Sequence, residues 1–378
     1  MSCHFTQAQC HIDLAALVRN FRRCGAPEKL MPVLKSDAYG HGLLEVARSL
    51  GQAGAQRFAV GCASEGQALR EAGFAQDILP LMPPMTEEEW STVTRFRLIP
   101  LVCSFAELEK ALAHADAAAP LPIAIKVETG MHRLGFREEE IPALITRLQA
   151  SPQLVPSMVV SHCSCADIPA RKANTAQQIL CFSSMASTLC AAFPAMRRSL
   201  FNSAGTLDTA SMCNICDVSR PGIILYGGNP FANTSEEALG ADFEWVMSLS
   251  TTILQVTELR KGEGVSYGQI YVADRDMRLA VVAAGYATGV QRNLTHKLEA
   301  LVHGHRVRAV GRICMNMTMF DVTDLPDVQA GDDVWLIGGP AAEGEHPVTA
   351  QEWAEKLGTI SYEILCLLGS LNPRVYHS

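Results

Sequence analysis

Short apolar runs rich in β-branched residues alternate with helical segments through the first two thirds of the chain. This alternation is the pattern of a parallel α/β fold. Capping signals mark the starts of several helices, including Asp13 before LAALVRNF and Thr86 before three glutamates. The eight runs that we interpret as strands are residues 30–35, 57–61, 77–81, 97–102, 121–127, 157–162, 198–202 and 222–226.

Eight strands within about 230 residues match the size of a (β/α)8 barrel. A doubly wound open sheet is the alternative, but no GxGxxG motif follows the first strand. We therefore expect an N-terminal (β/α)8 TIM-like barrel over residues 1–235. In such a barrel the functional side chains stand at the C-terminal ends of the strands.

The pattern changes after about residue 233, where strand-like runs come with glycine-rich turns and few helices. We expect a mostly antiparallel β domain over residues 236–378, closed by a helix near residues 350–357. We leave open that the first ten or so residues of the chain pair with it. The expected strands are residues 245–255, 279–284, 306–310, 317–322 and 333–336.

Composition narrows the class of protein. Apolar residues make up 48% of the chain and charged residues 19%, so a large core can be buried. A net charge of −8 without a basic cluster argues against a nucleic-acid partner. The N-terminus does not resemble a signal peptide, and no apolar run reaches the roughly 18 residues that span a bilayer. The 13 cysteines form no regular framework, which fits reduced thiols and a cytoplasmic location.

Lys35 ends the first apolar strand, in the run LKSDAYGHG. A lysine there is costly unless the site lowers its pKa or bonds it covalently, as in Schiff-base lysines. Taken alone, a surface lysine at a strand end is the more ordinary interpretation. Tyr39 follows four residues later, and Gly40 and Gly42 allow the backbone to approach a ligand closely.

Other candidates follow later strands. Arg133, in TGMHRLGF, is suited to gripping a carboxylate, although a surface ion pair is the simpler alternative. Lys126 is unusual because its neighbours in the fifth strand are apolar. Ser203, Gly222 and Ile223 lie in small-residue turns, where barrels often hold a phosphate, or they simply form turns.

The run SHCSCAD contains His162 and Asp167 with two cysteines, but no second pair follows at zinc-ligand spacing. We therefore expect no metal site, and His162 is also compatible with a buried hydrogen-bonding role. In the β domain, Tyr267 and Tyr286 are flanked by glycines. Tyrosines in this setting are most often packing residues at turns.

The segments LKSDAYGHG, TGMHRLGF, NSAG, RPGIILYG, VSYG and GRICMNMT, in this order, resemble the alanine racemase family over nearly the whole chain. The resemblance implies a cytoplasmic homodimer that uses pyridoxal 5′-phosphate (PLP) to interconvert L- and D-alanine for peptidoglycan. Lys35 would bind PLP as a Schiff base and exchange one proton with the substrate. Tyr267 of the other subunit would exchange a proton on the opposite face.

The resemblance also implies roles for further residues. Arg220 would face the pyridine nitrogen, and His162 would link Arg220 to Tyr267. Lys126 matches a position that is carbamylated in many members, where its negative charge orients the substrate-binding arginine. The substrate carboxylate would bind Arg133 and the backbone of Met315. The other expected cofactor ligands are Tyr39, Asn202, Ser203, Gly222, Ile223 and Tyr362. The expected entrance residues are Asp167, Tyr286, Arg292, Arg312 and Asn316.

Three positions depart from the usual family pattern. Thr288 and Asn316 stand where aspartate is usual, and Gln291 replaces a proline. These departures leave open a serine or broad-specificity racemase on the same scaffold. A PLP-dependent decarboxylase is less favoured, because such enzymes place a carboxylate where this chain has Arg220. A non-catalytic PLP carrier is a barrel alone, which does not fit a chain with a β domain.

Overall fold

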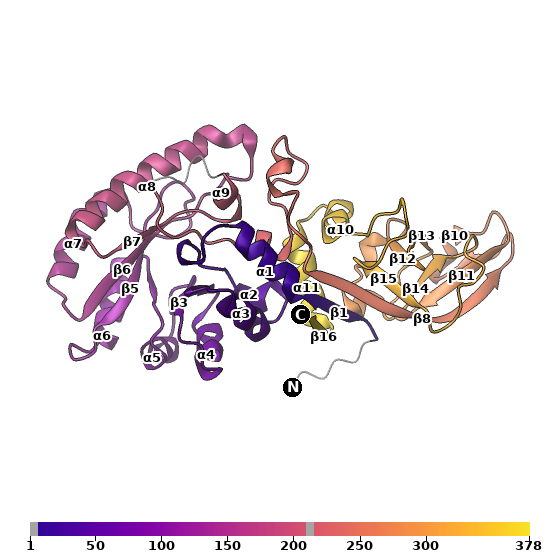
Figure 1. Cartoon of the computed structure of the whole chain (residues 1–378), viewed down its shortest axis with the longest axis horizontal. Coiled ribbons are helices and arrows are strands. Elements are labelled where there is room, and N and C mark those ends of the chain that lie inside the picture. Colours follow the sequence, from indigo (N-terminus) through magenta and orange to yellow (C-terminus); the bar gives the residue numbers. More distant parts are fainter. Residues whose placement is uncertain (1–6, 209–214) are drawn as a thin grey trace. The chain divides into compact units, whose positions relative to one another are not determined.

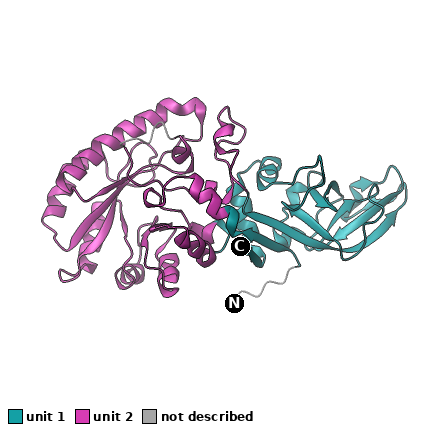
Figure 2. Ribbon diagram, viewed as in Figure 1, with its two compact units in different colours: residues 1–16, 39–42, 245–378 teal, residues 17–38, 43–244 magenta. Residues whose placement is uncertain are grey.

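The computed structural model describes residues 7–208 and 215–378, which form two compact units (Figure 2). We call residues 17–38 and 43–244 the barrel unit. We call residues 7–16, 39–42 and 245–378 the β unit. The chain therefore leaves the barrel unit shortly after its first strand and returns to it at residue 43.

The barrel unit contains a ring of parallel strand positions. β2 pairs with β3, and β4, β5, β6 and β7 pair in that order. Backbone hydrogen bonds close the remaining gaps of the ring: Ile99 N–H to Ile78 O (2.9 Å), Arg220 N–H to Phe201 O (2.9 Å), Met31 N–H to Ser219 O (2.8 Å) and Leu34 N–H to Ala59 O (2.7 Å). Counting residues 30–34 and 219–221 as the first and eighth positions, the described residues confirm the expected (β/α)8 barrel.

Helices lie on the outer side of these strands (Figure 1). The strands are apolar on both faces because the barrel interior covers one face and the helices cover the other; Ile123, Ile125 and Val159 are fully buried. The regular elements, in order, are α1 (Leu14–Arg23), α2 (Lys35–Tyr39), α3 (Leu43–Gln52), β2 (Arg57–Val60), α4 (Ala63–Glu71), β3 (Asp77–Pro80), α5 (Glu87–Arg95), β4 (Leu101–Val102), α6 (Phe105–His114), β5 (Leu121–Lys126), α7 (Ile141–Gln149), β6 (Leu154–Val160), α8 (Lys172–Ala192), β7 (Arg197–Ser199) and α9 (Ser203–Leu207).

The prediction of an eighth strand at residues 222–226 was wrong. Strand pairing ends at Pro221, and Ile223–Tyr226 form a fully buried 3₁₀ helix. A short apolar run without polar alternation is compatible with a buried strand or a buried helical turn, so its pattern could not separate them. The turn to helical geometry begins at Gly222, whose φ of −121° and ψ of −96° lie outside the strand region.

The β unit is built on a mostly antiparallel sheet. Its strand order is β11-β14-β13-β12-β15-β8-β1-β16, and an additional pairing between β11 and β8 closes six of these strands into a ring. The elements are β1 (Gln9–Asp13), β8 (Met247–Leu259), β9 (Gly264–Val265), β10 (Tyr271–Val272), β11 (Met277–Val282), β12 (Glu299–Val302), β13 (His305–Val310), β14 (Thr318–Asp321), β15 (Asp333–Ile337), α10 (Ala350–Leu357), α11 (Ser361–Leu371) and β16 (Arg374–His377).

The two ends of the described chain meet in this sheet. β1 pairs with β8 in antiparallel register, Cys10 opposite Leu249, and with β16 in parallel register, Cys10 opposite Arg374. β8 is 13 residues long, so its first half can pair with β1 and β15 while its second half pairs with β11. This long strand connects the ring of the β unit to the strands that continue its sheet.

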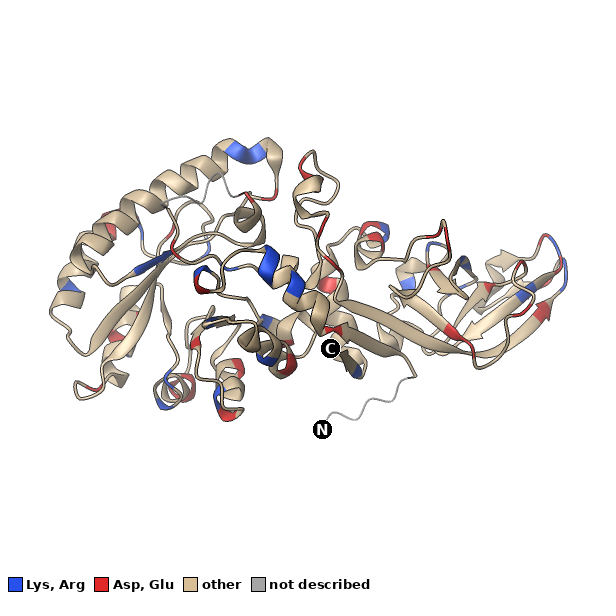
Figure 3. Cartoon of the chain, viewed as in Figure 1, with Lys and Arg blue, Asp and Glu red and all other residues tan. Residues whose placement is uncertain are grey.

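Acidic and basic residues are interspersed in both units (Figure 3). Many of them form ion pairs on the surface, such as Arg147 with Glu109 (2.8 Å) and Arg198 with Asp217 (3.0 Å). The electric fields of neighbouring charges of opposite sign largely cancel. Salt screens what remains at distances beyond the Debye length.

Candidate active site

Lys35 directly follows the first barrel strand. The preceding residue, Leu34, is fully buried, whereas Lys35 is exposed. The next four residues, Ser36 to Tyr39, all have φ near 55°, so the chain makes a left-handed turn. Each non-glycine residue in this conformation costs roughly 1–2 kcal/mol. Strain of this kind persists only where surrounding contacts hold it, and it is concentrated at functional sites.

The loops after the seventh and eighth strand positions meet at Ser203. Its buried Oγ accepts hydrogen bonds from Gly222 N (2.9 Å) and Ile224 N (3.4 Å). Asn202 caps α9 through its Oδ1 and donates from Nδ2 to Cys163 O (3.3 Å). Within the described residues, the N–H groups of Ser203 and Ile223 meet no protein acceptor. Unpaired N–H groups at two helix starts suit an anionic group.

Arg220 is buried beside His162. Its guanidinium donates to Ser161 O, to Ser199 Oγ and, from Nη2, to Leu200 O (3.4 Å). Burial lowers the Arg220 pKa to about 10, so the side chain stays cationic at neutral pH. Nη2 lies 3.5 Å from His162 Nδ1. Burial, and then the charge of Arg220, hold the His162 pKa well below its usual value, so the imidazole is neutral.

Lys126 ends β5 with its side chain almost fully buried. Burial and then the cationic Arg220 lower its pKa to about 7, and Arg133 acts in the same direction. Its amine forms no hydrogen bond or ion pair with the rest of the described chain. An amine with this pKa is largely uncharged in weakly basic solution, and only the uncharged form is nucleophilic.

Glu128 organises the loop that carries Arg133. Its carboxylate accepts from the backbone of Gly130, from Met131 N (2.7 Å) and from Arg133 N (3.2 Å). Burial alone would raise the Glu128 pKa, but these backbone N–H groups lower it below its usual value. The Arg133 side chain is left exposed and makes no ion pair within the described residues.

Three motif loops meet in the β unit. Tyr267 stands in the turn after β9 and is 69% exposed. The preceding residue, Ser266, donates from Oγ to Arg312 O (2.7 Å) and lies 3.4 Å from Cys314 Sγ. The loop GYATG is joined to Cys314 and the residue after it by two backbone bonds, from Tyr286 N to Cys314 O (3.0 Å) and from Ala287 N to Met315 O (2.9 Å).

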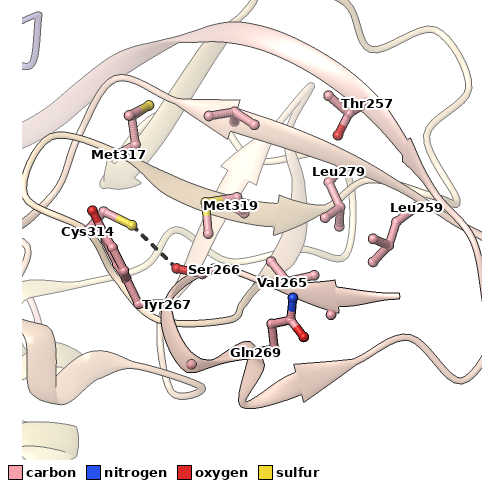
Figure 4. Close-up of a pocket in the computed structure, with 13 residues that line it drawn as sticks. Thr257, Leu259, Val265, Ser266, Tyr267, Gln269, Leu279, Cys314, Met317 and Met319 are labelled. Carbon is pink, nitrogen blue, oxygen red and sulfur yellow. Dashed lines mark hydrogen bonds between the residues drawn. The ribbon is translucent and has the colours of Figure 1, made fainter. Parts of the chain in front are cut away.

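A pocket of about 880 Å³ opens beside Tyr267 in the β unit (Figure 4). Tyr267, Ser266 and Cys314 lie near one another on one side of it. Leu259 and Leu279 lie on the other side, with Thr257 beside them. The exposed phenol of Tyr267 is therefore part of a hollow that polar and apolar side chains line together.

The predicted phosphate ligands Tyr39 and Tyr362 lie together in the β unit, with ring centroids 6.0 Å apart. Burial, with smaller contributions from Tyr362 and Cys366, raises the pKa of Tyr39. Gly40 and Gly369 allow the close approach of α11 to this segment, because a Cβ on Gly369 would lie only 1.9 Å from Gly40 O. Tyr39 therefore remains a neutral phenol that can donate a hydrogen bond.

The structure places the other predicted site residues in both units. Asp167 is half-buried in the barrel unit, in the loop after β6. Tyr286, Met315 and Asn316 are exposed in the joined loops of the β unit, and so is Arg292 in the turn that follows. Thr288 is buried and closes its own turn, because its Oγ1 donates to Gly285 O (2.8 Å). An aspartate could not donate this bond.

Sequence reasoning missed Glu65, which accepts a backbone hydrogen bond from the left-handed turn after Lys35. Its sequence signal is ordinary, because a glutamate three residues after a helix N-cap is common. It also missed the three acceptors of Arg220, which are the hydroxyl of Ser199 and the backbone carbonyl groups of Ser161 and Leu200. Among the described residues, no three His, Cys, Asp or Glu side chains gather to hold a metal, and no helix is long and apolar enough to cross a membrane.

The fold and the positions of these side chains define a class: a (β/α)8 barrel protein with its polar groups at the strand ends and a separate β unit presenting an exposed tyrosine. The chain belongs to the alanine racemase family. The family model "Alanine racemase, N-terminal domain" matches residues 12–230, and "Alanine racemase, C-terminal domain" matches residues 246–376.

Individual relatives agree with this assignment. The chain is 44% identical to the alanine racemase of Nitratidesulfovibrio vulgaris (strain DSM 19637 / Miyazaki F), with 100% of both chains covered. A crystal structure of biosynthetic alanine racemase from Pseudomonas aeruginosa superposes with a TM-score of 0.85 at 32% identity, covering 99% of this chain and 100% of that one. Alanine racemase from Bartonella henselae, with covalently bound pyridoxal phosphate, gives a TM-score of 0.84 at 27% identity, covering 98% and 99%.

Proposed function

We propose that the chain is a PLP-dependent alanine racemase in which Lys35 and Tyr267 exchange protons on opposite faces of the substrate. The observation that carries the proposal is the arrangement at the barrel strand ends. There Lys35 follows the first strand, and the unpaired N–H groups of Ser203 and Ile223 follow the seventh and eighth. The full-length similarity to alanine racemases, one of them with covalently bound pyridoxal phosphate, supports the same assignment.

The barrel residues fit the cofactor. The N–H groups of Ser203 and Ile223 would bind its phosphate. Gly222 N–H joins the two loops through Ser203 Oγ, and Asn202 caps α9. Tyr39 and Tyr362 would add phenolic donors. Lys35 would hold PLP covalently. When bound, PLP withdraws electrons from the substrate α-carbon and so eases removal of its proton.

Arg220 would face the pyridine nitrogen of the cofactor. It stays cationic at neutral pH and can only donate hydrogen bonds. The ring nitrogen would therefore be held unprotonated, as a hydrogen-bond acceptor. A carboxylate, which PLP-dependent decarboxylases place there, would favour the protonated nitrogen instead.

His162 would connect Arg220 to the phenol of Tyr267. Because His162 is neutral and its Nδ1 faces the Arg220 guanidinium, its proton resides on Nε2. Nε2–H can then donate to the Tyr267 oxygen and stabilise the phenolate that a base requires. Tyr267 is exposed in its own chain, which fits a residue that acts in the barrel of a second subunit.

Arg133 and the backbone of Met315 would bind the substrate carboxylate. Arg133 makes no ion pair and Met315 N–H has no acceptor within the described residues, so both can serve a ligand. Lys126 would be carbamylated, which would replace an unpaired buried amine by an anion beside Arg133 and Arg220. The entrance would be formed by Asp167, Tyr286, Arg292, Arg312 and Asn316.

We further propose a homodimer in the cytoplasm whose two active sites each combine the barrel of one subunit with the Tyr267 loop of the other. Its product, D-alanine, would serve peptidoglycan synthesis. The composition and the family assignment support this setting.

The proposal is tested by incubating the PLP-loaded protein with a panel of single L-amino acids and separating the products on a chiral column. Alanine should racemise with the highest kcat/KM. A preference for serine would reassign the enzyme within its family, since one hydroxyl in a small apolar pocket changes selectivity by only about 1–3 kcal/mol. Release of carbon dioxide from ornithine or diaminopimelate, without racemisation, would reject the proposal in favour of a decarboxylase.

A further inference from the structure

The left-handed turn after Lys35 must be held by its surroundings. Ser36, Asp37 and Ala38 have φ of 55–56° and ψ of 47–51°, and none is glycine. At roughly 1–2 kcal/mol for each residue, the turn would relax without fixed partners. One partner lies within the turn, where Ala38 N–H donates to Leu34 O (2.8 Å).

Glu65 supplies a partner from another part of the barrel unit. It is the third residue of α4, and its Oε1 accepts from Asp37 N–H at 3.0 Å. Its Oε2 accepts from Gly61 N–H at 2.6 Å, at the end of the second strand. An ionised carboxylate is an acceptor only, so both of its oxygens match the donors that they face.

Gly61 shows how closely these elements approach. A Cβ on Gly61 would lie 2.9 Å from Glu65 Oε2 and 3.3 Å from Lys35 Cβ. The Glu65 carboxylate and the start of the Lys35 side chain therefore flank the same point of the second strand. Glycine at this position leaves room for both groups beside the second strand.

Two other helices of the barrel unit show that this use of a glutamate is specific. Glu89 in α5 and Glu107 in α6 occupy the same third position. Glu89 Oε2 accepts from Met85 N (2.7 Å) and Thr86 N (3.2 Å), and Glu107 Oε2 accepts from Cys103 N (2.5 Å). Both glutamates bond groups at the start of their own helix, whereas Glu65 also reaches the turn after Lys35.

Asp37 fixes the far end of the turn. Its Oδ1 accepts from Leu43 N–H at 2.7 Å, the first residue of α3. The Asp37 backbone thus donates to Glu65 while its side chain accepts from α3. The two carboxylates hold the turn between two helices.

We propose that Glu65 is a positioning residue that sets the geometry of Lys35 for cofactor binding. This inference rests on the proposed function of Lys35. Glu65 does not touch the reacting atoms; it holds the backbone from which the Lys35 side chain projects. Its loss lets the turn relax, so the amine is no longer pre-organised and the cofactor binds more weakly.

The test compares the apoprotein of the full chain with Glu65→Gln, Glu65→Asp and the matched control Glu89→Gln. Glutamine offers one acceptor oxygen, and its NH2 group would face a backbone N–H donor, so one amide loses its partner. Aspartate keeps the charge but is one methylene shorter, so it reaches one amide at most. Two quantities are measured for each protein: the Kd for PLP and the pH midpoint of the visible absorbance band of the bound cofactor.

We expect Glu65→Gln to weaken PLP binding about tenfold and to shift the pH midpoint, with Glu65→Asp in between. Glu89→Gln should match the wild type in both measurements, although its apoprotein loses a similar amount of thermal stability. If the wild type binds PLP at Lys35 and Glu65→Gln behaves as Glu89→Gln does, the positioning role of Glu65 is rejected, whereas the proposed function of Lys35 stands. If the wild type does not bind PLP at Lys35, the proposed function and this inference both fail.

Discussion

Arg220, which is buried, and His162, which is half-buried, form a pair in which a permanent cation faces a neutral imidazole, with Nη2 and Nδ1 3.5 Å apart. The cation cannot lose its proton near neutral pH, and its charge, added to burial, keeps the imidazole from gaining one. The proton of His162 is therefore confined to Nε2. His162 can therefore donate a hydrogen bond from Nε2, and this donor is not lost or moved near neutral pH.

We predict that His162 does not titrate in the working pH range. His162→Gln should lower kcat for alanine racemisation about tenfold, because an amide donates a weaker hydrogen bond than imidazole to the Tyr267 oxygen. The pKa of the acidic limb of the pH–rate profile should not move, since glutamine does not titrate and His162 is already neutral. Disappearance of that limb in His162→Gln would show that His162 is protonated during turnover.

Lys126 should make the free energy of unfolding increase with pH. Its pKa is about 7 in the folded protein and about 10.5 when unfolded, so the unfolded chain binds more protons between these values. The free energy of unfolding should therefore rise with pH across this range. In buffer free of carbon dioxide, the rise should exceed that of Lys126→Met by an amount on the order of a few kcal/mol.

Adding bicarbonate tests carbamylation of Lys126 separately. The wild type should gain thermal stability and 44 Da of mass under native conditions, and Lys126→Met should show neither change. A wild type that is insensitive to bicarbonate would mean that Lys126 remains an amine.

Ser203 should matter for the cofactor more than for the fold. Ser203→Ala removes the acceptor of Gly222 N and Ile224 N, so both loops lose their shared contact. We expect PLP affinity to fall about tenfold and the free energy of unfolding to fall by about 1 kcal/mol. Ser157→Ala is the control, because it removes a single bond from Ser157 Oγ in β6 to Ile123 O in β5, and it should change stability alone. Equal PLP affinities for the two variants would contradict a phosphate site at Ser203.

Subunit sharing can be tested by complementation. Lys35→Ala and Tyr267→Ala should each be nearly inactive alone. After the two proteins are mixed and their subunits exchange, half of the dimers are mixed, and each mixed dimer contains one site with both residues intact. Activity should therefore return to about a quarter of the wild-type value. No recovery, with exchange verified by native mass spectrometry, would place both residues of each site in a single chain.

The sequence pattern predicted the elements that have one clear local signal, either a continuous apolar run or a capping motif. The parallel strands of the barrel are continuous apolar runs, and the helix expected near residues 350–357 is observed as α10 (Ala350–Leu357) because Thr349 and Glu352 form a capping box. The run of residues 223–226 failed because a short apolar segment carries no period. β12 and α11 were missed because their apolar residues pack in the core without a marked alternation or a side-chain cap.

Some parts of the candidate site could be predicted from the sequence and others could not. Lys35, Arg133 and Ser203 could be placed because strand ends in a barrel share one face. The left-handed turn could not be foreseen, since SDAY contains no glycine and its conformation depends on the carboxylate of Glu65, 28 residues from Asp37. A pattern of neighbouring residues cannot predict a hydrogen bond between residues so far apart in the sequence.

Borohydride reduction tests most directly whether Lys35 binds the cofactor. The protein is loaded with PLP, reduced, digested with trypsin and mapped by mass spectrometry. Reduction should abolish the visible band and leave the added mass on residues 30–48, because a modified Lys35 blocks cleavage within that segment. A label on any other lysine, or no visible band before reduction, would contradict cofactor binding at Lys35.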